Sequence, residues 1–147
     1  MTPVLLRALE HVHGHLGWMS VAALAHPAVF LRRPRRAPLS VVLATSLVIG
    51  AAVIGALIYP RYRDRLKQHI FLDAPRIGWL FERKEHLAVG AVAFALAGCV
   101  AHLALPLVPD SARRAIDRLA HRAFVAALAL SLVVAALGIV VAAFRSF

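Results

Sequence analysis

The chain has 147 residues, of which 61% are hydrophobic and only 16% are charged, and its mean hydropathy is +0.77. Soluble domains have an apolar content near one half, so this composition excludes an ordinary soluble enzyme and a disordered tail. The 17 Lys and Arg residues outnumber the 7 Asp and Glu residues, which gives a formal net charge of +10. A single cysteine, Cys99, excludes an internal disulfide and a multi-cysteine metal centre.

The first predicted membrane span covers residues 10–31 and is rich in histidine. The sequence ArgArgProArgArgAlaPro at 32–38 follows it. We expect the span to end there because Pro34 and Pro38 lack the N–H that a continuing helix needs.

The second predicted span, residues 39–59, is the clearest sign of a membrane protein. These 21 residues contain no ionisable group except Tyr59. As a helix they are about 30 Å long, which matches the hydrocarbon core of a bilayer. Pro60 is expected to stop this helix.

Residues 60–85 form the longest polar stretch, and they are too few to bury a core alone. Tyr62, Leu66 and Ile70 recur at helical spacing among charges of both signs. This pattern predicts an amphipathic segment that lies along the membrane surface, covers the His11–His86 end and contacts a partner subunit. The alternative is a plain connector anchored at headgroup level by aromatic residues.

The third and fourth predicted spans cover residues 86–105 and 122–144, separated by Pro106, Pro109 and a short amphipathic stretch. The predicted fold is therefore all-α: one membrane domain over residues 1–147, built as an integral membrane four-helix bundle. Four spans place both termini on the same side. Lys and Arg are nearly balanced between the two sides, so a cytoplasmic location of the termini is only the default.

Most basic residues gather at the ends of the apolar runs. Juxtamembrane Lys and Arg contact anionic headgroups and set orientation. We therefore expect the lipid bilayer as the partner of these charges, and no nucleic acid.

The eight histidines are the candidate functional residues. Ionisable side chains inside a membrane are costly and mark functional sites. The first and third spans run in the same direction, and their depths predict two pairs: His26 with His102, and His11 or His15 with His86. Paired imidazoles on facing helices are the ligands of a b-type haem iron. The sequence thus predicts one or two haem b groups, with quinone as a further candidate ligand, in an electron-carrying subunit of a respiratory or redox complex.

Helical geometry also supports other hypotheses. His86 and His102 are about 160° apart around their helix, which conflicts with two haems stacked on one face. An interhelical hydrogen bond to a backbone carbonyl or to Ser or Thr would equally explain His26 and His102. His11 and His15, four residues apart, could share a copper or zinc ion. The alternatives to a haem protein are therefore a cofactor-free accessory subunit and a metal-ion binding or transport protein. All three differ from a stand-alone enzyme.

Two sequence stretches carry a resemblance. YPRYR at 59–63 and LFERKEHLA at 80–88 are similar to the loop of small, uncharacterised bacterial four-helix membrane proteins. The resemblance implies a multi-pass protein of the bacterial inner membrane and implies no activity. Glu82, Glu85 and Asp73 are candidate proton or quinone-headgroup partners on this side.

Overall fold

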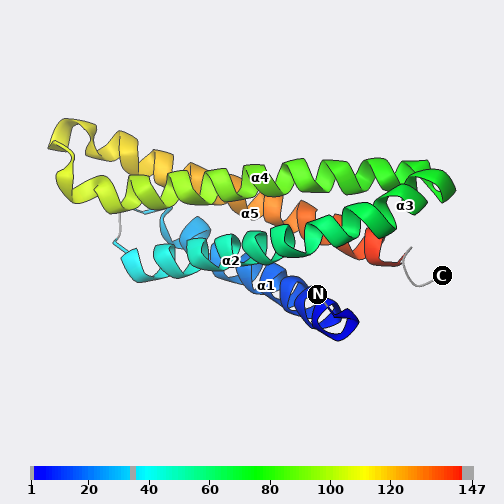
Figure 1. Ribbon diagram of the computed structural model, residues 1–147. Coiled ribbons are helices and arrows are strands. Elements are labelled where there is room, and N and C mark those ends of the chain that lie inside the picture. The colour runs from blue at the N-terminus through cyan, green and yellow to red at the C-terminus, as the bar shows by residue number, and fades with distance from the viewer. Residues whose placement is uncertain (1, 34–35, 144–147) are drawn as a thin grey trace.

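The computed structural model describes residues 2–33 and 36–143, and all of its regular structure is helical (Figure 1). The elements in chain order are α1 (Pro3–Phe30), α2 (Pro38–Tyr62), a π-helical turn η1 (Arg63–Lys67), α3 (Gln68–Asp73), α4 (Pro75–Ala104), a 3₁₀ turn η2 (Leu105–Leu107) and α5 (Asp110–Ala143). The predicted all-α class is confirmed. The four predicted spans fall on the four long helices, although Pro34 and Phe144 lie outside the described residues.

Proline begins helices in this chain more often than it ends them. Pro38 and Pro75 occupy the first turns of α2 and α4, where a missing N–H costs nothing because no intrahelical acceptor is available. Pro60 lies inside α2, so the prediction that it stops the helix is wrong. A proline inside a helix frees only the carbonyl one turn earlier, and in membrane helices this loss is tolerated.

The four long helices pack side by side in a closed order. α1 contacts α2 and α5, and α4 contacts the same two helices, so α1 and α4 stand at opposite corners. Figure 1 shows the ends of α1 and α4 and the starts of α2 and α5 together at one end of the molecule. The beginning of α1, the end of α5 and α3 lie toward the other end.

Small residues allow the helices to approach closely. Phe124 of α5 and Leu24 of α1 are fully buried in a core that also contains Ala44, Ala95 and Ala127. Gly98 of α4 receives the Phe124 ring, since a Cβ at Gly98 would lie 3.0 Å from that ring.

Residues 60–85 are helical, as predicted, but they form an upright hairpin. The turn η1 and α3 continue the line of α2, and residues 76–85 are the first part of α4 (Figure 1). The segment therefore runs along the long axis of the molecule instead of across its end. Ile70, Ile77 and Phe81 bury their side chains together with Val141 of α5, and this contact holds the hairpin upright.

Three of the described helices are long and apolar enough to cross a membrane: α2, α4 extended to Leu107, and α5. α1 does not reach this level although it has 28 residues. Four histidines, together with Arg7 and Glu10, lower its hydropathy.

Candidate functional site

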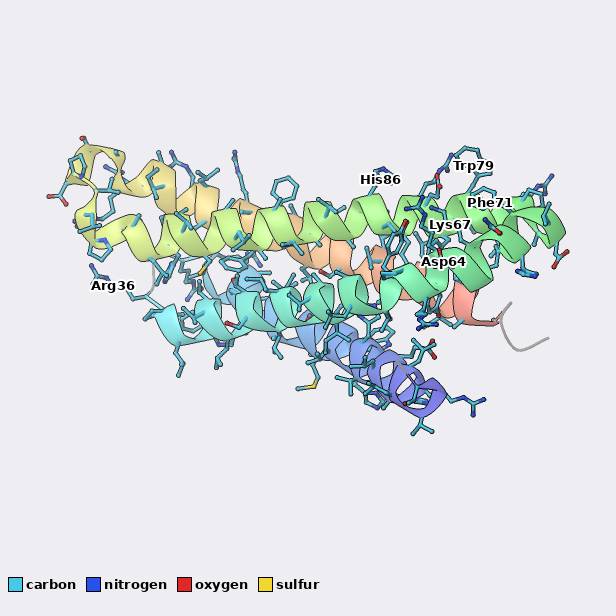
Figure 2. The ribbon with its side chains drawn as sticks, viewed as in Figure 1. Arg36, Asp64, Lys67, Phe71, Trp79 and His86 are labelled. Carbon is cyan, nitrogen blue, oxygen red and sulfur yellow. The ribbon has the colours of Figure 1, made fainter. Side chains whose placement is uncertain are left out.

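Three of the predicted ligand histidines lie on the outside of the molecule. His11, His15 and His86 are all exposed, and His86 points outward from α4 in Figure 2. The Nδ1 of His15 lies 2.7 Å from the carbonyl oxygen of His11, and that of His86 lies 2.8 Å from the carbonyl oxygen of Glu82. A carbonyl only accepts, so both rings carry their proton on Nδ1 and donate within their own helix.

His26 connects α1 to α2. Its Nδ1 lies 2.7 Å from the hydroxyl oxygen of Ser40, and its ring stacks on Phe30 with the centroids 4.9 Å apart. The side chain stays exposed at the edge of the helix pair.

His102 connects α4 to the start of α2. It is only 4% exposed, and its Nε2 accepts a hydrogen bond of 3.2 Å from the backbone N–H of Ala37. The neutral ring therefore carries its proton on Nδ1, which is buried and has no hydrogen-bond partner among the described residues. An axial imidazole binds iron through the lone pair of Nε2. In His102 this lone pair accepts the hydrogen bond from the Ala37 N–H.

His13 is the inter-helix contact that the sequence did not reveal. Its half-buried ring donates from Nδ1 to the carbonyl oxygen of Ala51 at 2.9 Å. The ring lies against Gly55 of α2, where a Cβ would come within 2.9 Å of the His13 Cε1. Depth alone does not separate His13 from His11 and His15, but helical spacing does, because two residues along a helix are about 200° of rotation.

Four of the predicted ligand histidines make hydrogen bonds: His15 and His86 bond within their own helices, and His26 and His102 bond toward α2. The expected pairs join α1 to α4, which stand at opposite corners, and a haem held between paired imidazoles stays a prediction. Across the ranges that the structure describes, no three His, Cys, Asp or Glu side chains gather closely enough to hold a metal ion.

A second polar cluster links the two arms of the hairpin. Lys67 of η1 places its Nζ 2.9 Å from Glu82 and 3.9 Å from Glu85, both on α4. The hydrogen bond that Lys67 donates to Glu82 raises the pKa of Lys67 above its ordinary value. The carboxylates considered as proton or quinone partners are thus engaged with Lys67, whereas Asp73 is exposed at the end of α3.

Aromatic pairs lie on both sides of this ion pair. Tyr62 and Phe81 stack with centroids 5.8 Å apart, and Phe71 meets Trp79 edge-on at the same distance. Figure 2 shows Lys67 and Phe71 on the arm that continues α2, with Trp79 on α4. A Cβ at Gly78 would lie 2.8 Å from the Phe71 ring, so the two arms touch at this glycine. The hairpin is therefore a rigid projection and not a flexible tether.

No protein-family model, curated protein or solved structure matches this chain.

Proposed function

We propose that the chain is an integral membrane four-helix protein and a cofactor-free accessory subunit of a larger membrane complex. The long helices turn much of their apolar surface outward: at most a third of each candidate span is buried within the molecule. Outward apolar faces of this length need lipid or other membrane helices around them.

The outer face of α1 is the observation that carries the accessory role. It exposes His11 and His15 beside Trp18 and Met19. Polar imidazoles facing lipid tails are costly, and α1 has no stretch as apolar as those of the three candidate spans. A partner helix packed on this face would remove the cost. The open space around Gly14, where an added Cβ would meet no atom within 4 Å, lets such a helix approach closely.

The inter-helix hydrogen bonds support a structural role for three of the histidines. His13 and His26 bond from α1 to α2, and His102 bonds from α4 to Ala37, the residue before α2. Such bonds contribute about 0.6 kcal/mol each in membrane helices, with a maximum near 1.7 kcal/mol. The haem b and electron-transfer hypothesis remains an untested prediction, and so does binding or transport of a metal ion at His11 and His15.

Two glycines provide a matched test of the α1 contact. Gly14 of α1 and Gly138 of α5 both have open space around them. Gly14→Leu should block the partner helix and reduce the native complex to the free 15.9 kDa chain, while Gly138→Leu should leave the complex intact. Native electrophoresis of detergent extracts measures the size, and carbonate washing shows that each variant remains in the membrane.

Two results would overturn the proposal. One is release of the wild-type chain from membranes by carbonate. The other is a Soret band with split visible bands in reduced-minus-oxidised spectra of the purified protein, because a haem protein would then replace the cofactor-free subunit. Equal complex size in the Gly14 and Gly138 variants would reject the α1 contact.

A further inference from the structure

The outward face of α5 is basic near the start of the helix and apolar farther along. Arg114, Arg118 and Arg122 are all exposed and follow one another at intervals of four residues. The same face continues with Val125 and Leu132, which are also exposed. At four-residue spacing the three arginines lie on one side of the helix, about 6 Å apart along its axis.

This arginine stripe, defined as Arg114, Arg118 and Arg122, is not neutralised within the protein. Asp110 forms its ion pair with the neighbouring Arg113, at 2.8 Å. None of the three stripe arginines forms an ion pair with another residue of the described ranges. Like charges four residues apart on a helix repel each other, so an external anion would stabilise the stripe.

The surroundings of the stripe are apolar on one side and basic on the other. Gly98 packs against Ala120 and Phe124, and this register places the stripe beside the last turns of α4. Those turns expose Val100 and Leu103. The connection after α1, at the same end of the molecule, exposes further cations: Arg32, Arg33 and Arg36 (Figures 1 and 2).

We propose that the arginine stripe binds the phosphate groups of anionic phospholipid headgroups. The inference rests on the proposed membrane insertion of α5. From Val125 to Ala143 the helix rises about 28 Å, close to the thickness of the hydrocarbon core. The stripe then lies at the headgroup level, where arginine pairs with phosphate in a forked geometry and its aliphatic stem remains in the apolar layer.

Lipid selectivity provides the test. The full-length protein is placed in nanodiscs of phosphatidylcholine containing a minor fraction of phosphatidylglycerol, and the lipids that remain bound after detergent release are quantified. Each basic residue near an anionic surface contributes about 1 kcal/mol, so we expect a preference of about tenfold or more for phosphatidylglycerol, weakened by added NaCl. The variant R114Q/R118Q/R122Q should lose most of it. The control R61Q/R63Q/R76Q removes three exposed arginines at the hairpin end and should keep it.

The outcomes separate the inference from its premise. Equal retention of both lipids by wild-type protein that resists carbonate extraction rejects the stripe while leaving the membrane subunit in place. Release by carbonate rejects both.

Equal loss in the two triple variants shows a general effect of net charge and rejects the stripe. If the stripe variant fails to fold, the wild-type salt dependence decides, since a preference that is unchanged by NaCl is not electrostatic. Displacement of the lipid by inorganic phosphate at constant ionic strength would instead identify a site for the free anion.

Discussion

At the scale of single residues, three of the eight histidines make hydrogen bonds that join helices within the described ranges: His13, His26 and His102. His13 donates to Ala51, whereas His15, only two residues along, bonds within α1 and stays exposed. The two side chains differ in the face of α1 that they occupy, which a depth argument does not resolve. The same distinction separates buried His102 from exposed His86, in agreement with the half-turn between them that the helical period predicts.

Replacing His13 by leucine should destabilise the contact between α1 and α2. The change removes the bond to Ala51 and places a branched side chain against Gly55. We expect the free energy of unfolding in detergent to fall by about 0.5–1.5 kcal/mol. His15→Leu is the control. It removes only an exposed hydrogen bond within one helix, so the free energy of unfolding should change by less than about 0.5 kcal/mol. Equal effects of the two substitutions would show that the bond to Ala51 contributes nothing.

Gly98→Ala and Gly138→Ala should have opposite effects. Alanine in a helix is favoured over glycine by about 1 kcal/mol, and Gly138 has open space for the added methyl group. At Gly98 the methyl group would press on the fully buried Phe124 ring, and overpacking of this kind costs about 1–3 kcal/mol. Thermal unfolding should therefore show a stabilised Gly138 variant and a Gly98 variant destabilised by up to about 2 kcal/mol. Stabilisation by both would mean that Phe124 moves aside freely.

At the scale of the elements, the hairpin from Arg61 to Glu85 depends on the π-helical turn. A π turn contains one residue more than an α turn, so the residues after it are rotated relative to α2. Lys67 and Ile70 then face α4, where Lys67 meets Glu82 and Ile70 enters an apolar cluster. If α2 continued as a regular α-helix, Lys67 and Ile70 would point away from α4.

The Lys67–Glu82 pair should contribute a small, pH-dependent coupling. In a double-mutant cycle with Lys67→Met and Glu82→Gln we expect about 0.2–1 kcal/mol at neutral pH, the range for partly exposed pairs. The pKa of Lys67 is raised in the folded state. Its contribution is therefore complete below the ordinary lysine value of 10.5 and disappears as the pH rises through the higher folded value. Unfolding followed by Trp fluorescence measures the cycle. A coupling that persists well above that pH, or no coupling at pH 7, would contradict this account.

At the scale of the whole molecule, the sequence predicts the helices but not their neighbours. Apolar runs and prolines locate all four long helices, because those signals are local. The packing order depends on which faces fit: Gly98 accepts Phe124, and the hydroxyl of Thr45 reaches the carbonyl of Ala95 at 3.4 Å. For this reason the sequence did not place α1 and α4 at opposite corners, and the predicted His pairs between these helices stay a prediction. The direction of the hairpin could not be read from the sequence either, since the helical spacing of Tyr62 and Ile70 is the same for an upright helix and for one on the membrane surface.

The register of α4 and α5 is a further property of the assembled molecule. With Gly98 opposite Ala120, the apolar parts of the two helices are staggered along the axis. The arginine-rich start of α5 lies beside the apolar end of α4. The apolar end of α5 lies beside the charged start of α4, as the contact of Val141 with Phe81 and Ile77 shows.

Membrane topology is the prediction that tests the whole arrangement. The starts of α2 and α5, beside residues 37 and 110, lie at one end of the molecule, and α3, which contains the 81% exposed Leu72, lies toward the opposite end (Figure 1). Reporter fusions at 37 and 110 should therefore give the same side of the membrane, and a fusion at 72 the other side. A reporter placed before Thr2 decides the position of α1, the long helix that is not among the candidate spans. It should agree with the fusion at 72 if α1 crosses the membrane, and agreement with the fusion at 37 would mean that α1 lies on the surface and that only three helices cross. A fusion at 72 that agrees with those at 37 and 110 would reject the transmembrane arrangement of α2 and α4 altogether.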